Sequence, residues 1–295
     1  MEATESAGSP SHWVHDLDPV IFQITDSLAV RWYGLAYVSA FLIGFALLHL
    51  YWRRGRSPVG PAAQESLAMA LILGVIIGGR LGYFLLYDFG SFIANPFIFF
   101  HVWEGGMASH GGFAGVAAGG WWVARRHAID PLRLGDLIAS VAAQGFFLGR
   151  MANFINGELW GKVSDVPWAV IFPGSAPEGW PVDLIAPRHP SQLYQAFLEG
   201  LLLFAIIQWR FWKIPDRAGA GRGHLPKAAR PGHLTGEFLI LYSLARWIGQ
   251  YFREPDAALI AVLSRGSFYS LFLLLAGIIL VLWTRRGRLT NDKSA

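Results

Sequence analysis

The chain of 295 residues has no cysteine and few charged side chains. Without cysteine, disulfides, thiolate metal sites, iron–sulfur clusters and a cysteine nucleophile are all excluded. Charged residues make up only 15% of the chain, whereas a soluble globular domain usually carries about 25%. Hydrophobic residues make up 54%, and 13 residues are tryptophan, a side chain common at membrane interfaces. This balance excludes an ordinary cytosolic enzyme and favours a polytopic membrane protein.

Seven apolar segments divide the sequence. The first, residues 32–52, carries no charge and is long enough to span a bilayer core of about 30 Å. Basic residues follow this segment, which is the reverse of their order in a cleavable signal peptide. The other six cover residues 66–87, 105–124, 134–148, 191–209, 234–250 and 267–283. We therefore expect an all-α polytopic membrane protein with seven transmembrane helices.

The basic residues test this arrangement, because Lys and Arg collect in cytoplasmic loops. With the amino end outside, most of the 24 basic residues fall in segments on the cytoplasmic side of the membrane, at residues 53–56, 125–133, 210–230 and 285–293. The outside loop 88–104 contains none, and the outside stretch 151–190 contains only Lys162 and Arg188. The sequence thus predicts an N-terminus outside and a cytoplasmic C-terminus. The net charge of +4 marks topology in a lipid bilayer and does not indicate nucleic-acid binding.

The connecting segments differ in composition. Residues 88–104 are rich in Phe, which suits a segment lying in the outer interface between spans 2 and 3. Polar residues among several Trp predict a small outer cap at 151–190, and Gly, Ala, Arg and Pro predict an inside linker at 213–232. The expected organisation is a polar N-terminal tail at 1–15, a seven-span domain at 16–288 and a cytoplasmic tail at 289–295. No internal repeat is visible, which weakens an inverted-repeat transporter interpretation.

Ionisable side chains inside apolar segments are costly and are therefore candidates for a functional site. Arg80 lies near the end of its segment, so snorkelling to the interface and a functional role both remain open. His110 lies in a glycine-rich run, where the backbone can closely approach a ligand or another helix. A neutral imidazole there can accept a proton, although a membrane histidine can also be simply hydrogen-bonded within a bundle.

The densest polar cluster follows the fourth apolar segment. Arg150, Asn153, Asn156 and Glu158 lie within nine residues and predict a cation, two amides and a carboxylate at one membrane depth. A planar guanidinium with amide donors suits a phosphodiester headgroup. The competing interpretation is a helix cap followed by a solvated loop.

Arg246 lies in the sixth apolar segment, on the same predicted helix face as Tyr242 and Gln250. Its own segment offers no obvious acidic partner for it, so it requires an anion, either a ligand phosphate or a carboxylate elsewhere. Tyr33 lies at the outer end of the first span, where it could also be an interfacial aromatic residue. Residues 189–194 could likewise be only the entry to the fifth span.

Several of these segments resemble motifs of bacterial prolipoprotein diacylglyceryl transferases. The matching residues run from Asp18–Pro19 to about Arg288 and include 31–34, 105–112, 149–161, 189–194 and Arg246 with 253–256. The resemblance implies that the catalytic residues are His110, Arg150, Arg246 and Tyr33. It also implies that substrate is bound by Arg150, Asn153, Asn156, Glu158, Gly161, Tyr242, Arg246 and Arg253. Two positions depart from the family pattern, because Gln195 and Gln250 stand where Glu is common.

The resemblance also implies an activity, which needs no metal or other cofactor. The diacylglyceryl group of phosphatidylglycerol would move to the lipobox cysteine of a prolipoprotein signal peptide at the bacterial cytoplasmic membrane. A thioether and glycerol phosphate would result. Two other classes of function remain open from the residues alone: a transporter or flippase of anionic lipid or solute that uses the same arginines, and a lipid-binding scaffold. The oligomeric state cannot be inferred from the sequence.

Overall fold

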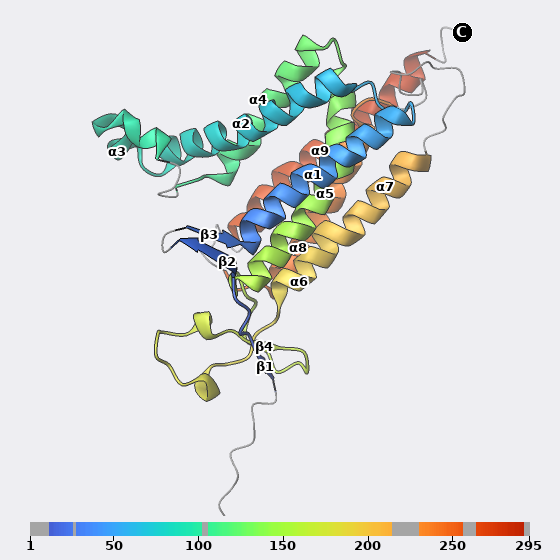
Figure 1. Cartoon of the computed structure of the whole chain (residues 1–295). Helices are drawn as coiled ribbons and strands as arrows, with labels where there is room; N and C mark the ends of the chain where they lie inside the picture. Colours follow the sequence, from blue (N-terminus) through green and yellow to red (C-terminus); the bar gives the residue numbers. More distant parts are fainter. Residues whose placement is uncertain (1–11, 26–27, 102–105, 214–229, 256–263, 292–295) are drawn as a thin grey trace, which may run out of the picture. The chain divides into compact units, whose positions relative to one another are not determined.

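The computed structural model describes residues 12–25, 28–101, 106–213, 230–255 and 264–291 and is mostly helical (Figure 1). Helices occupy all seven predicted apolar segments. Six of them are filled by α1 (Trp32–Arg53), α2 (Pro61–Leu86), α4 (Ser109–Arg126), α5 (Pro131–Ile155), α8 (His233–Phe252) and α9 (Arg265–Asn291). In the fifth segment, α6 (Ser191–Gln195) continues through the π-helical turn η5 (Ala196–Leu202) into α7 (Leu203–Lys213). Three stretches, Trp32–Arg53, Pro61–Leu85 and Gly266–Arg285, are long and apolar enough to cross a membrane.

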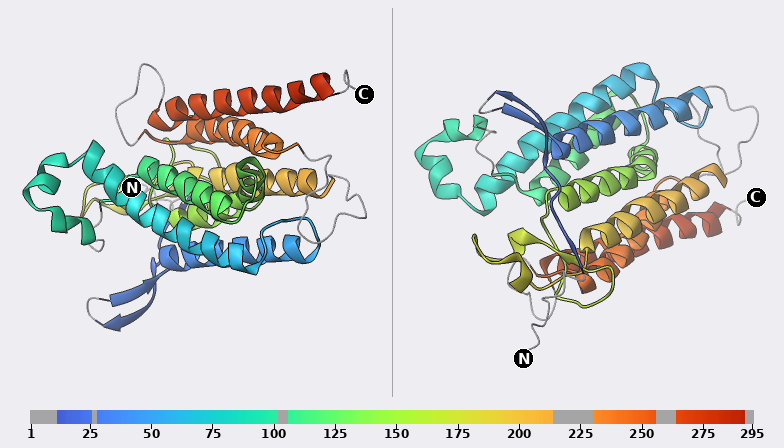
Figure 2. Two further views of the ribbon diagram at one scale, coloured as in Figure 1. Left: turned by 90° about the horizontal axis from the view of Figure 1, so that it is seen from above. Right: turned by 60° about the horizontal axis from the view of Figure 1, so that its bottom comes forward.

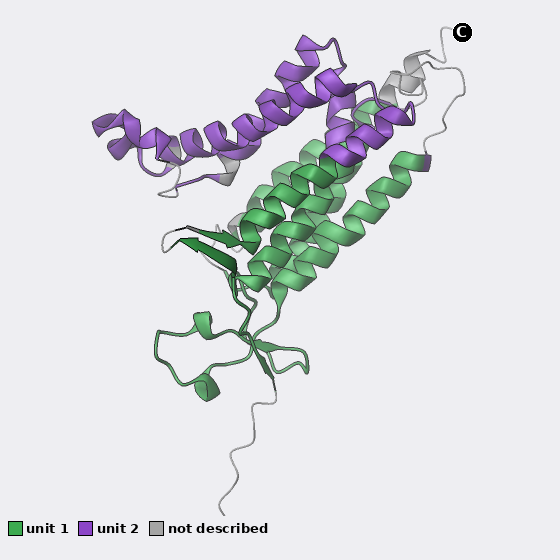
Figure 3. Ribbon diagram, viewed as in Figure 1, with its two compact units in different colours: residues 1–44, 139–212, 234–295 green, residues 45–138, 213–233 purple. Residues whose placement is uncertain are grey.

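The chain divides into two compact units (Figure 3). Unit 1 consists of residues 1–44, 139–212 and 234–295, and unit 2 of residues 45–138 and 213–233. The predicted inside linker falls largely at residues 214–229, outside the described part of the chain.

Unit 1 contains a helical bundle in which close backbone approaches join neighbouring helices. Helices α8 and α9 lie side by side in both views of Figure 2, because Gly236 on α8 faces Gly277 on α9 with no room for a side chain between them. Phe146 on α5 stacks on Tyr242 of α8, with 4.9 Å between ring centroids. The first half of α1 joins α5 through Gln144, whose Nε2 donates to the carbonyl oxygen of Ala40 at 2.7 Å.

Short strands complete unit 1. Strand β1 (Trp13–Val14) pairs in parallel with β4 (Val170–Ile171), and β2 (Val20–Thr25) pairs antiparallel with β3 (Leu28–Arg31). The 3₁₀ turns η3 (Pro173–Ser175) and η4 (Val182–Leu184) lie in the same loop region as β4. The sequence prediction contained no strands. Strands β1 and β4, with two residues each, are too short for an alternating pattern, and the longer β2 and β3 were missed in the segment before the first span. Strand β1 lies within the segment predicted as a polar tail.

Unit 2 is held together by a glycine contact between α2 and α4. Gly74, Gly78 and Gly82 recur at every fourth position of α2, as do Gly111, Gly115 and Gly119 on α4. A Cβ atom at Gly78 or Gly115 would collide with the backbone of the opposite helix. This is the small-residue packing typical of membrane helices. Gly111, directly after His110, therefore serves helix contact, one of the two uses that the sequence left open for this glycine-rich run. An apolar groove of about 1190 Å³ follows the pair.

Arg80 has a structural place in unit 2. Its side chain is 2% exposed, and its guanidinium donates from Nε to the carbonyl oxygen of Phe99 at 3.0 Å and from Nη2 to that of Ile98. Both carbonyls belong to η1 (Pro96–Phe100), which follows α3 (Phe89–Ala94). Arg80 thus fastens the predicted interfacial segment to α2. The outward aromatic and aliphatic side chains of that segment are exposed, among them Phe89, Ile93, Phe97 and Phe100.

Candidate functional site

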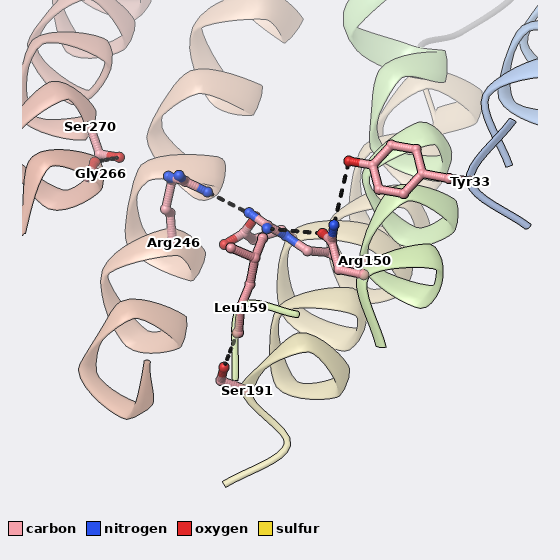
Figure 4. Close-up of polar contacts among 9 residues, drawn as sticks. Tyr33, Arg150, Leu159, Ser191, Arg246, Gly266 and Ser270 are labelled. Atoms are coloured by element: carbon pink, nitrogen blue, oxygen red, sulfur yellow. Dashed lines mark hydrogen bonds and ion pairs between the residues drawn. The ribbon is translucent and has the colours of Figure 1, made fainter. Parts of the chain in front are cut away.

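Two arginines from different helices of unit 1 share one buried carboxylate. Nη2 of Arg150 on α5 lies 3.2 Å from Oε2 of Glu199, and Nη1 of Arg246 on α8 lies 3.3 Å from the same oxygen. Glu199 is fully buried, whereas the two arginine side chains are 15% and 19% exposed. The anion that Arg246 requires is therefore met here by a carboxylate from another segment. Figure 4 shows this network, with Arg246 and Tyr33 on either side of Arg150.

The position of Glu199 depends on the local backbone. Glu199 lies in η5, a π-helical stretch, and such stretches occur frequently at functional sites. The next residue, Gly200, faces the backbone of Phe147 on α5, and a Cβ there would lie 2.6 Å from the Phe147 Cα. The missing side chain lets η5 approach α5 closely enough for Glu199 to reach Arg150.

A second set of hydrogen bonds orients Arg150 from its other side. Nη1 of Arg150 donates to Oδ1 of Asn153 at 3.5 Å, and Nδ2 of Asn153 donates to Oε1 of Glu158 at 2.7 Å. The same amide nitrogen lies 3.4 Å from the Tyr33 hydroxyl oxygen. The structure therefore brings together four residues that the sequence singled out: Tyr33, Arg150, Asn153 and Glu158.

Arg246 is packed between α8 and α9. Its guanidinium lies 6.0 Å from the ring centroid of Tyr242, a geometry that permits a cation–π contact. On the α9 side, a Cβ at Gly266 would lie 3.1 Å from Nη2 of Arg246 and would also collide with Nε2 of Gln250. Tyr242, Arg246 and Gln250 thus line one face of α8, as the helix periodicity predicts.

The remaining predicted binding residues lie at the ends of α5 and α8. Gly161 passes between His189 and Phe252 with no room for a side chain. Its backbone forms an isolated antiparallel β-bridge with Arg253. The Arg253 side chain is 6% exposed. Oδ1 of Asn156 is buried and has no hydrogen-bond partner among the described residues. Gly161 and Arg253 therefore join the segment after α5 to the end of α8.

His189, in the loop before α6, has a perturbed environment. Its Nδ1 lies 3.1 Å from the Tyr194 hydroxyl, and its ring packs edge-on against Phe252. Burial lowers the pKa of His189 below its usual value of 6.5, and the nearby Lys162 ammonium lowers it further. His189 is therefore neutral at pH 7, where its ring can accept a hydrogen bond.

His110 is the second residue of α4 and belongs to unit 2, whereas both arginines belong to unit 1. Its side chain lies outside the described part of the structure. A position of His110 beside Arg150 and Arg246 therefore stays a prediction.

Glu199, which is fully buried, is the site residue that sequence reasoning missed. The signal was available, because Glu199 is the one acidic residue in the apolar segment 191–209. The criterion that selected His110, Arg150 and Arg246 selects Glu199 equally well. The arrangement as a whole can bind an anionic group through two guanidiniums whose spacing is held by a carboxylate. Within the described ranges, no three His, Asp or Glu side chains gather as a metal site.

Comparison with known sequences identifies the family of the chain. Residues 19–283 match the family described as prolipoprotein diacylglyceryl transferase. The chain belongs to this family. A relative from Ruegeria pomeroyi is 47% identical over 253 residues, which cover 82% of each chain. Relatives from Idiomarina loihiensis and Rhodospirillum rubrum are each 41% identical and cover 92% of this chain and 94% of their own. All three are named phosphatidylglycerol–prolipoprotein diacylglyceryl transferase, and the arginine pair lies within the part shared with the family.

Proposed function

We infer that the chain is a membrane enzyme that transfers the diacylglyceryl group of phosphatidylglycerol to prolipoproteins. One observation carries the inference: in a chain of this family, two guanidiniums from separate helices converge on one buried carboxylate. The family match and the names of the relatives support the transferase activity. The apolar helices support a multi-pass protein of the bacterial inner membrane. A transporter or flippase finds no support in these comparisons.

We propose that seven helical segments span the membrane, with the N-terminus outside and the C-terminus in the cytoplasm. Helices at all seven apolar segments and the alternation of basic loops support this topology. The folded loop after α5, with β4, η3 and η4, would then form a cap on the outer face. The helices α3 and η1 would lie in the outer interface, where their exposed Phe side chains suit the boundary between lipid and water.

The phosphate of the lipid donor is proposed to bind at Arg150 and Arg246. Arginine presents several donors in a planar fork, which matches two oxygens of a phosphodiester. Asn153 orients Arg150 from one side and Glu199 from the other, so little side-chain entropy is lost when the lipid binds. Glu158 and Tyr33 would act through Asn153, to which both are hydrogen-bonded.

The proposed reaction is a substitution at the sp³ carbon that carries the phosphate. The thiolate of the lipobox cysteine forms a C–S bond, the C–O bond breaks, and its electron pair stays on the phosphate oxygen of the departing glycerol phosphate. A free thiol has a pKa near 8.5, so a base must take its proton at neutral pH. We propose His110 for that role. Arg150 and Arg246 stabilise the charge that develops on the leaving phosphate and so lower the barrier.

The decisive experiment combines the purified chain with phosphatidylglycerol and a peptide that carries one lipobox cysteine. Mass spectrometry should show the peptide heavier by one diacylglyceryl unit, together with free glycerol phosphate. A transporter would move lipid without a mass change, and a lipid-binding scaffold would retain lipid without one. An Arg246→Ala protein purified in the same way serves as the inactive control.

A further inference from the structure

Two neighbouring side chains beside the arginine pair carry buried polar atoms without partners. Gln195 and Glu199 are both 0% exposed. Among the described residues, neither the Oε1 nor the Nε2 atom of Gln195 has a hydrogen-bond partner, and neither does Oε1 of Glu199. Buried side-chain polar atoms are nearly always paired with protein or ordered water. Three unpaired atoms in two adjacent side chains therefore indicate a place for a polar group that is not part of the chain.

Both side chains face the same neighbouring helix. Gln195 packs against Gly249 of α8, where a Cβ would lie 2.7 Å from the Gln195 Cγ, and Glu199 contacts Arg246 of the same helix. Arg246 and Gly249 are three residues apart on α8 and therefore lie on one face of that helix. Gln195 and Glu199 are four residues apart, about one helical turn, and likewise share a face. Glu199 thus lies next to the guanidinium pair, and Gln195 packs against α8 one turn before it.

The Gln195 end of this row lies toward the loop region. Ser191, at the start of α6, donates from its hydroxyl to the carbonyl oxygen of Leu159 at 3.0 Å, and Gln192 donates from Nε2 to that of Glu158 at 2.7 Å. Gln195 therefore lies between the arginine pair and the segment that follows α5. A group bound to the arginines and extending toward this segment would meet the Gln195 amide.

We propose that Gln195 and Oε1 of Glu199 form a subsite for the hydroxyl-bearing headgroup of the phospholipid donor. The subsite rests on the proposed function, which places the phosphate at Arg150 and Arg246. A terminal glycerol has two hydroxyls, each of which can donate and accept a hydrogen bond. The Gln195 amide offers one acceptor and one donor group, and Glu199 offers a further acceptor.

The orientation agrees with the proposed topology. In a lipid of the outer leaflet, the headgroup extends from the phosphate toward the outside water. Gln195 lies on that side of the arginines, because α6 begins at the segment proposed as the outer cap. An amine headgroup fits less well, because an ammonium has no acceptor for Nε2 of Gln195 and adds a cation beside two guanidiniums.

The experiment compares two lipid donors that share the phosphodiester. Phosphatidylglycerol carries the hydroxyls, and phosphatidylethanol lacks them. Since a site built to bond a hydroxyl discriminates against an analogue without it, we expect wild type to favour phosphatidylglycerol by at least about tenfold in kcat/KM. Gln195→Met keeps the side-chain length but removes both amide atoms. It should lower kcat/KM for phosphatidylglycerol by about tenfold to hundredfold and leave that for phosphatidylethanol nearly unchanged.

Gln208→Met is the matched control. Gln208 lies on α7, and its Nε2 donates to the carbonyl oxygen of Ser140 at 2.8 Å, so this substitution removes a structural hydrogen bond. It should leave the ratio of kcat/KM for the two donors unchanged.

Equal losses for both donors in Gln195→Met would overturn the subsite and assign Gln195 to packing. Equal use of the two donors by wild type would also overturn it, whether or not the variant folds. Wild type that transfers from neither donor would instead contradict the proposed function.

Discussion

Arg150 and Arg246 donate to the same carboxylate oxygen of Glu199, at 3.2 and 3.3 Å, from two different helices. Two cations would otherwise repel each other in a poorly solvated site, and the shared carboxylate fixes their separation before any ligand arrives. A preformed pair of this kind can bind a phosphate without reorganising as the leaving group gains charge. Binding and catalysis should therefore both depend on this pair.

Substitution of either arginine tests this dependence. Arg150→Ala and Arg246→Ala should abolish diacylglyceryl transfer while the protein still inserts into the membrane. Arg246→Lys keeps the charge but loses the planar fork, and we expect kcat to fall by about 10²–10³-fold, as when one preorganised donor is removed. Transfer rates of purified proteins measure the effect. The control is Arg210→Lys, because Arg210 forms a bidentate pair with Glu237 elsewhere in the bundle. Full activity in an inserted Arg246→Ala protein would contradict the assignment.

The pH dependence of a His110 variant tests the proposed base. His110→Gln should lower the rate at neutral pH, because the substrate thiol then keeps its proton. As the pH approaches the thiol pKa near 8.5, the thiolate forms without help and part of the loss should be recovered. The measurement is kcat/KM for wild type and variant between pH 6.5 and about 9. A loss of the same size at every pH would move the role to another residue.

Gly266 tests the packing around Arg246. In Gly266→Ala, the new methyl group would lie 3.1 Å from Nη2 of Arg246 and would displace the Gln250 amide. Both neighbours are flexible side-chain ends, so the fold should persist while the guanidinium shifts. Because misplacement of a catalytic group by about 1 Å can cost 10²-fold in rate, kcat/KM should fall by up to about that factor with little change in Tm.

The control for Gly266→Ala is Gly120→Ala. The nearest atom to a Cβ at Gly120 is Cδ1 of Ile138, at 3.6 Å, which is an ordinary contact. This variant should retain wild-type activity. An unchanged rate in Gly266→Ala would show that Arg246 tolerates displacement.

Gly200 tests the close approach of η5 to α5. Alanine at this position would overlap the backbone of Phe147, which cannot move aside. Such overpacking costs about 1–3 kcal/mol, so Gly200→Ala should lower both Tm and activity, although alanine normally favours a helix. Gly145→Ala on α5 meets only Cβ of Ala40 at 3.6 Å and should not lower Tm. Thermal unfolding of both variants in detergent measures their Tm. An unchanged Tm in Gly200→Ala would contradict the close approach of η5 to α5.

Titration of His189 tests whether its environment in the loop before α6 lowers the pKa of its ring. Burial, the larger cause, and Lys162 both lower its pKa below 6.5, so the folded protein binds fewer protons at this site than the unfolded chain. Its contribution to stability is present above pH 6.5 and is lost as the pH falls through the lowered folded pKa. Lys162→Met should raise the pKa of His189 but leave it below 6.5. NMR titration of the labelled ring measures it, and no movement in Lys162→Met would exclude the electrostatic cause.

The long helices could be predicted from the sequence because each coincides with an apolar segment that is visible without any knowledge of the fold. The polar cluster of Arg150, Asn153 and Glu158 was equally accessible, since its members are close in sequence. Glu199 was not connected to Arg150 or Arg246, because only the packing of η5 against α5 and α8 brings them together. The pairing of β1 with β4 was missed for the same reason: its partners are remote in sequence and each strand has two residues.

The glycine contact between α2 and α4 bears on the order of assembly. Glycine has no side-chain rotamers to lose, so pairing these helices costs no side-chain entropy at the contact. The two helices are also close in the chain, which favours early and rapid association. They can therefore form a helical hairpin as soon as both have been inserted, before α5 and α8 have brought the two arginines together. Substitutions in these glycines should accordingly lower the yield of inserted protein more than the turnover of the molecules that do assemble.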